Sequence, residues 1–159
     1  MSKFEVSLAE LKTSNNPQDV LVASSLGSCI GLAVYDPIIR VGGLLHYVLP
    51  YSKIDASKAL TIPGMFADTG VPLLFREMYK LGAKKERMLV KVTGGSHILG
   101  DSRVFDMGKR NYVMLRKIFL KNKVKIAGED VGGNENRNLV LNIKDGRCFV
   151  QVQGEDKEL

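Results

Sequence analysis

Short runs of alternating hydrophobic and polar residues fill the first third of the chain, and this period of two is typical of half-buried β-strands. Phe4, Val6 and Leu8 alternate within residues 3–9, and further strands are predicted at 20–23, 30–35 and 41–49. Asp36-Pro37 and Pro50 should end the last two of these, because proline removes a backbone donor and restricts the residue before it.

Two later segments have the spacing of amphipathic helices. One apolar face is formed by Val71, Leu74, Phe75, Met78 and Leu81. We expect Asp68 to be the N-cap of this helix, so that Pro72 falls near its first turn, and Gly82 to occupy the C′ position. A second helix is predicted at about residues 107–122.

The remaining segments suggest more strands joined by loops. Residues 51–66 show no period and are expected to form a long loop, and 128–134 a polar glycine loop. Strands are predicted at 88–92 and 124–127, and a hairpin at 139–143 and 148–152, where Asp145-Gly146 is a strong turn signal. The tail, 154–159, is expected to fray. About eight strands and two helices predict a single α+β domain over residues 1–159, with helices on one side of the sheets.

Composition narrows the class of protein. No apolar run is long enough to span a membrane, and the amino terminus lacks the apolar region of a signal peptide. The two cysteines are therefore expected to be free thiols in the cytoplasm. A net charge of +6 permits an acidic partner, which can be a nucleic acid, an anionic membrane surface or a protein. Solvated helix faces explain the same charge, and no aromatic stacking motif supports nucleic-acid binding.

Candidate chemistry concentrates between Leu26 and Pro50. Cys29 follows Gly27-Ser28 at the start of one predicted strand, and His46 lies near the end of the next. If these strands pair, the thiol and the imidazole can face each other, and an ion pair between them would lower the pKa of the cysteine. Each residue also has a plain structural interpretation, a small buried thiol and a hydrogen-bonded core histidine.

Other polar residues offer weaker alternatives. His97, which follows Gly94-Gly95-Ser96, is a competing base, and Cys148 is most simply a core residue. Cys29, His46, His97 and Cys148 lack the close ligand spacing of a zinc site, so we expect no metal. The glycine pairs at 94–95 and 132–133 match neither a P-loop nor a dinucleotide fingerprint, which favours tight turns and predicts no cofactor.

A series of separated motifs occurs in order along the chain: Leu26-Gly27-Ser28-Cys29, His46 with Leu49-Pro50, Phe66-Ala67-Asp68-Thr69, Thr93-Gly94-Gly95, Gly108-Lys109-Arg110-Asn111 and Glu129-Asp130-Val131-Gly132-Gly133-Asn134. This series resembles the CheD family of bacterial chemoreceptor glutamine deamidases, and the resemblance spans roughly residues 4–153. It implies a layered α/β/β sandwich like that of cysteine-dependent toxin deamidases. It also implies hydrolysis of receptor glutamine to glutamate, with glutamyl methyl esters as a further substrate of some members.

The resemblance assigns catalytic roles to Cys29 and His46, and a CheC-type phosphatase as a partner besides the receptor helices. The family's third catalytic residue, a threonine, falls on Ala23, which has no hydroxyl. Ser24 and Ser25 are candidate substitutes, Ser25 because it shares the face of Ala23 if the strand stays extended. Alternatively, a backbone carbonyl can hold the imidazole. Backbone amides near Ser28 and Cys29 are the expected oxyanion donors.

Two hypotheses follow for function. In the first, the protein is an amidohydrolase that acts on receptor glutamines without metal or cofactor. In the second, motivated by Ala23, it is a weakly active or inactive module that binds and regulates the phosphatase. Neither hypothesis requires nucleic-acid binding or membrane insertion.

Overall fold

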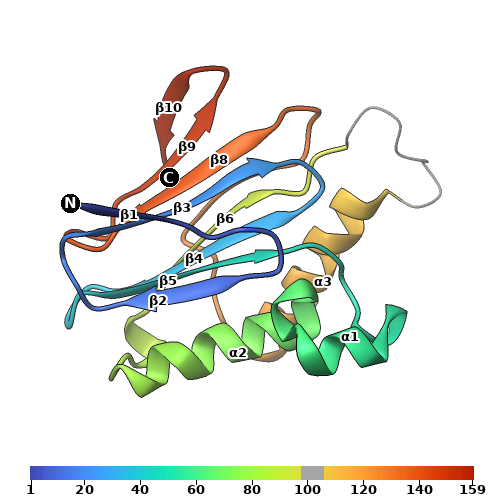
Figure 1. Cartoon of the computed structure of the whole chain (residues 1–159), viewed down its shortest axis with the longest axis horizontal. Coiled ribbons are helices and arrows are strands. Elements are labelled where there is room, and N and C mark those ends of the chain that lie inside the picture. Colours follow the sequence, from blue (N-terminus) through green and yellow to red (C-terminus); the bar gives the residue numbers. More distant parts are fainter. Residues whose placement is uncertain (98–105) are drawn as a thin grey trace.

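A computed structural model describes residues 1–97 and 106–159 of the chain, and within them ten strands form two mixed five-stranded sheets beside three α-helices (Figure 1). The outer sheet has the order β1-β3-β8-β9-β10, and the central sheet has the order β2-β5-β4-β6-β7. The strands are β1 (Ser2–Glu5), β2 (Leu11–Ser14), β3 (Asp19–Leu26), β4 (Ile30–Asp36), β5 (Val41–Tyr47), β6 (Leu89–Gly94), β7 (Gly128–Val131), β8 (Arg137–Asn142), β9 (Cys148–Val152) and β10 (Glu155–Glu158). The helices are α1 (Ala56–Thr61), α2 (Ala67–Lys80) and α3 (Met107–Lys121).

The central sheet lies between the helices and the outer sheet, because successive side chains of a strand point to opposite faces. On β5, Leu45 and Tyr47 belong to the core cluster that includes α2 and α3 residues. Leu44, which precedes Leu45 and points to the opposite face, belongs to the second cluster, with residues of β3, β8 and β9. Helices, central sheet and outer sheet therefore form three layers, which confirms the α+β class and the helices on one side (Figure 1).

The strand pair β4–β5 positions the candidate residues. The two strands are antiparallel, with Gly31 opposite His46 and Ile30 opposite Tyr47. On its other side β4 pairs with β6, so β4 is an interior strand of the central sheet. All seven residues of each of β4 and β5 are buried, and this gives the site a rigid base.

The predicted helix at 71–81 is confirmed as α2, but its expected cap is wrong. The N-cap is Phe66, and Asp68 lies in the first turn. The carboxylate of Asp68 accepts hydrogen bonds from the backbone N–H and the hydroxyl of Ser52, at 2.9 and 2.8 Å, so it ties the helix to the preceding segment instead of capping it. Gly82 follows the C-cap residue Leu81 with a φ of 96°, as expected for the C′ position.

Several short elements differ from the sequence prediction. The expected loop at 51–66 contains α1, whose N-cap Asp55 accepts a hydrogen bond from the Lys58 amide at 3.1 Å. A six-residue helix is too short to show a period. The strand predicted at 124–127 is found four residues further along the chain, as β7. Strand β2 was not predicted. The tail does not fray along its length, because β10 pairs antiparallel with β9.

Candidate active site

Cys29 lies in the turn between β3 and β4, where the chain crosses from the outer sheet to the central sheet. Three backbone carbonyl oxygens of this turn accept hydrogen bonds from other parts of the chain. The Gly27 oxygen accepts from the Ser96 N–H at 2.9 Å, and the Cys29 oxygen accepts from the Gly95 N–H at 2.9 Å. The Ser28 oxygen accepts from the Asn111 side chain at 2.9 Å. The backbone orientation of the turn is therefore fixed.

The backbone amides of the same turn are not bonded to any carbonyl of the described residues. Among the described residues, no hydrogen bond is donated by the backbone N–H of Gly27, Ser28 or Cys29. The Cys29 N–H lies close to its own sulfur, where it partly offsets the effect of burial on the thiol pKa. Backbone donors fixed beside a thiol can stabilise a tetrahedral oxyanion.

Two glycines pack closely against the backbone around the Cys29 turn. Gly94 has a φ of +105°, and a Cβ placed on it would lie 2.2 Å from the Cys29 carbonyl oxygen. Gly108, in the first turn of α3, approaches the Ser96 carbonyl as closely, at 2.2 Å from its ideal Cβ. Only glycine allows such approaches. These two glycines therefore allow close backbone packing around Cys29.

His46 projects from β5 toward the outer sheet and is 2% exposed. Its ring Nδ1 lies 3.1 Å from the carbonyl oxygen of Val6, which directly follows β1. Because a carbonyl can only accept, Nδ1 carries the proton and Nε2 is the unprotonated nitrogen. Nε2 is buried and has no hydrogen-bond partner among the described residues. The one free atom of this imidazole is therefore a proton acceptor.

Cys29 and His46 lie on the same face of the central sheet. Gly31 is directly opposite His46, and Cys29 is two residues before Gly31, so all three share one side of the sheet. A diagonal pair of this kind has Cα atoms about 7–8 Å apart, within reach of long side chains. The expectation that these two strands pair is confirmed, and the pairing puts both residues on the face that packs against the outer sheet. Among the described residues, no hydrogen bond joins the thiol to Nε2.

Burial makes both groups neutral at rest. It raises the pKa of the Cys29 thiol above its ordinary value of 9.0, and it lowers the pKa of His46 below 6.5. The hydrogen bond to Val6 and the charges of Glu5 and Glu10 only partly oppose the shift of the histidine. The expected thiolate–imidazolium ion pair is thus not the resting state. A neutral imidazole beside a neutral thiol can act as a general base when the thiol attacks.

Asn111 joins the two halves of this site. Its side-chain Nδ2 donates to the Ser28 carbonyl at 2.9 Å and to the Val48 carbonyl at 2.8 Å. Ser28 precedes the cysteine, and Val48 follows the strand that carries His46. The backbone carbonyl of Asn111 also accepts from the Tyr47 hydroxyl at 2.7 Å. A single buried residue in the first turn and a half of α3 therefore fixes the turn of Cys29 relative to the exit of β5.

The part played by Asn111 was not recognised in the sequence, although the signal is present. The buried positions of α3 include Asn111, Leu115 and Phe119, which share one face at a spacing of four residues. A polar amide on the core face of a helix requires hydrogen-bond partners inside the protein. Such a residue is a candidate for holding irregular backbone.

Known proteins resemble this chain over nearly its whole length. The family described as "CheD chemotactic sensory transduction" matches residues 48–152. A protein of Syntrophus aciditrophicus (strain SB), named probable chemoreceptor glutamine deamidase CheD 1, is 55% identical over 154 residues, which cover 97% of this chain and 96% of the relative. Two further relatives, from Solibacter usitatus and Anaeromyxobacter dehalogenans, are also named probable chemoreceptor glutamine deamidases. They are 43% and 42% identical to this chain, and the matched segments cover 94% and 95% of the relatives' lengths.

This chain belongs to the CheD family. The relatives match 95% or more of the chain, so the likeness extends over the Cys29 turn and β5 as well as the segment that the family description covers. In the part of the CheD chain that the structure describes, no helix has the length and hydropathy needed to cross a membrane.

The position of the family threonine is fully buried in this CheD chain. Ala23 lies on β3, level with Val6, which directly follows the neighbouring strand β1, because Glu5 pairs with Val22. The carbonyl that holds His46 therefore comes from the strand next to Ala23. This contact is the backbone alternative expected for a chain without the threonine hydroxyl.

The candidate serines are placed differently. The pairing of β3 with β8 shifts register between Ala23 and Leu26, which marks a β-bulge. Ser25 is exposed there, with a φ of 56°, and its N–H donates to the Asn138 side chain at 2.8 Å. The strand does not stay extended, so Ser25 does not share the face of Ala23. Ser24 and Ser28 are half-buried, and Ser28 contributes its carbonyl to the Asn111 contact.

The competing residues lie elsewhere. The ring of His97 is 3.8 Å from the Asp106 carboxylate, and the His97 side chain is 40% exposed. Cys148 is buried in the core between the sheets, and burial raises its pKa to about 12. Both cysteines are free thiols. Within residues 1–97 and 106–159, no three His, Cys, Asp or Glu side chains come together as metal ligands.

Proposed function

We propose that this protein hydrolyses the side-chain amide of glutamine residues in bacterial chemoreceptors to give glutamate. Membership of the CheD family and the names of its relatives, which are chemoreceptor glutamine deamidases, support this substrate. The observation that supports the chemistry most is the state of His46, whose Nδ1 is held by Val6 and whose Nε2 has no described partner.

In the proposed mechanism, Cys29 is the nucleophile and His46 the general base. The sulfur attacks the amide carbon while His46 Nε2 takes the thiol proton, so charge develops on the substrate oxygen instead of on a resting thiolate. The backbone amides of Ser28 and Cys29, which donate to no carbonyl of the described residues, stabilise that oxygen. His46 then returns the proton to the leaving nitrogen, and ammonia departs from a thioester.

Water completes the cycle. His46 takes a proton from water, the hydroxide adds to the thioester carbon, and the carbon–sulfur bond breaks to give glutamate and the Cys29 thiol. The reaction balances with water as the only co-reactant. A glutamyl methyl ester follows the same steps, with methanol as the leaving group.

Deamidation of a receptor cytoplasmic fragment tests this proposal by mass spectrometry. Wild-type protein should convert particular glutamines to glutamate, and Cys29→Ala should abolish the conversion while the protein remains folded. Cys148→Ala is the matched control, because it removes the other buried thiol and should leave conversion in place. Conversion that persists in Cys29→Ala would refute the assigned nucleophile.

We also propose cytoplasmic receptor helices and a CheC-type phosphatase as protein partners, and the cytoplasm as the compartment. The family resemblance alone supports the phosphatase. If the chain is chiefly a binding module, a complex with the phosphatase should survive both Cys29→Ala and His46→Ala, and wild-type protein should show no turnover. Turnover by wild-type protein would exclude that alternative.

A further inference from the structure

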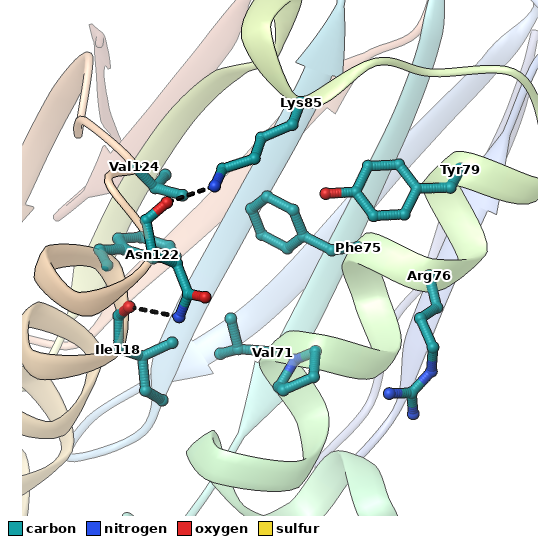
Figure 2. A pocket seen from close by; sticks show the side chains of 10 residues that line it. Val71, Phe75, Arg76, Tyr79, Lys85, Ile118, Asn122 and Val124 are labelled. Atoms are coloured by element: carbon teal, nitrogen blue, oxygen red, sulfur yellow. Dashed lines mark hydrogen bonds between the residues drawn. The ribbon is translucent and has the colours of Figure 1, made fainter.

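A groove lies between α2 and the carboxyl-terminal part of α3. Figure 2 shows its apolar floor, to which Val71 and Phe75 of α2 and Ile118 of α3 contribute, together with Val124 beyond the end of α3. Phe119 completes the floor, and the cavity has a volume of about 250 Å³. Across the groove, the Lys85 ammonium donates to the Asn122 carbonyl (Figure 2).

The rim of this groove is basic. Arg76 and Lys85 line it directly. Lys123 and Lys125, with one acidic residue, Glu86, line a second hollow that shares Phe75, Lys85 and Val124 with the first. We use the name basic groove for the floor of Val71, Phe75, Ile118, Phe119 and Val124 with the rim of Arg76, Lys85, Lys123 and Lys125.

The two segments that contribute the rim of the basic groove are rich in positive charge. Residues 76–88 and 109–125 contain twelve of the 23 Lys and Arg residues but two of the 17 Asp and Glu residues. Their net charge is therefore +10, and the rest of the chain carries −4, which together give the net charge of +6. A cation-rich rim around an apolar floor is complementary to a partner with apolar anchors flanked by acidic groups.

We propose that the basic groove binds an acidic amphipathic helix of a protein partner. A helix presents apolar side chains at i, i+3, i+4 and i+7 along one stripe, which fits an elongated groove between two helices. Asp and Glu residues beside that stripe would meet the rim. Nucleic acid has no apolar side chains for the floor, and a membrane surface needs a protruding apolar face, whereas this floor is concave.

The basic groove is separate from the proposed active site. Asn111 holds the Cys29 turn near the start of α3, and the groove uses residues from Ile118 onward. Along a helix with a rise of about 1.5 Å per residue, these positions are roughly 10 Å or more apart. The proposal therefore does not depend on deamidation.

Binding of a designed peptide tests the basic groove. The probe is a fluorescent peptide of about 18 residues, five turns of helix, with leucine at the stripe positions and glutamate beside them. A scrambled peptide of the same composition, phosphatidylglycerol vesicles and duplex DNA serve as comparison ligands. The rim variant is Arg76→Glu/Lys125→Glu, and the charge-matched control is Lys3→Glu/Lys144→Glu, at exposed positions on the outer sheet and its β8–β9 turn. A floor variant, Ile118→Glu, places a carboxylate among the apolar side chains.

The amphipathic peptide should bind saturably, and the rim variant should weaken it about tenfold while the control changes it little, since exposed charge pairs each contribute modestly. Ile118→Glu should also weaken it, and circular dichroism should show both variants folded. Equal binding of the scrambled peptide, tighter binding of vesicles or DNA, or no peptide binding would each overturn the proposal. Deamidation by the rim variant should match wild type, so a failure of the proposed enzyme activity would be seen independently of the peptide result.

Discussion

The two hydrogen bonds of Asn111 lead to the most specific prediction about the site. Asn111→Leu keeps the size of the side chain but leaves the carbonyls of Ser28 and Val48 without their donor. Each buried carbonyl without a partner costs about 1–3 kcal/mol, and the loss of Asn111 Oδ1, which is itself buried without a described partner, recovers part of this. We therefore expect a net loss of about 1–5 kcal/mol in the free energy of unfolding.

The effect on activity should exceed the effect on folding. A protein with a free energy of unfolding of about 5–15 kcal/mol still folds after such a loss in most of this range. The Cys29 turn, however, would no longer be fixed relative to β5, and a displacement of about 1 Å at a reacting group can cost about 100-fold in rate. We expect kcat for receptor deamidation to fall by about this factor, with a smaller change in KM.

The assay compares deamidation rates at a temperature where circular dichroism shows the variant folded. Asn122→Leu is the matched control at the C-cap of the same helix. Asn122 is exposed, and among the described residues its side chain donates only to the Ile118 carbonyl, at 2.8 Å. It should leave kcat nearly unchanged. If folded Asn111→Leu keeps wild-type kcat, Asn111 supports only the fold, and the positioning argument is wrong.

Four further predictions follow from the contacts of single residues. Burial lowers the pKa of His46, so its neutral form persists below pH 6.5. We therefore expect kcat/KM to fall only as the pH drops through a midpoint below 6.5. A midpoint above that value would contradict the assignment of His46 as the base. Iodoacetamide should label Cys29 before Cys148, because Cys29 is 9% exposed whereas Cys148 is 1% exposed and has a pKa of about 12. Peptide mapping that finds the reverse order would count against the proposed nucleophile. Gly94→Ala should lower the melting temperature and the activity together, because the positive φ alone costs about 1–3 kcal/mol and the new Cβ meets the Cys29 carbonyl; an unchanged melting curve would show that the turn can move. Ser25→Ala should change stability by less than about 0.5 kcal/mol and leave kcat near wild type, since the side chain is exposed on the bulge, whereas a large loss of kcat would assign its hydroxyl a role.

Sequence patterns were sufficient for the elements that have a clear period. The helices α2 and α3, the strands β3, β4 and β5 and the β8–β9 hairpin were predicted close to their observed bounds. The pairing of β4 with β5, which puts Cys29 and His46 on one face of the central sheet, was expected from their order along the chain and is confirmed. The short elements α1, β2 and β10 were not predicted, because four to six residues are too few to establish a period.

What the sequence determined by itself is the chemistry available, namely one thiol at the end of a glycine turn and one imidazole on the next buried strand. Only the tertiary structure decided how these groups are held. The Val6 carbonyl that orients His46 is 40 residues away in the sequence, and Asn111 is 83 residues from Ser28. Contacts of this range depend on how the sheets and helices pack, and local periodicity carries no information about them. Burial between the sheets likewise sets the resting charge, so that the pair is a neutral thiol and a neutral imidazole instead of the ion pair expected from the residue types.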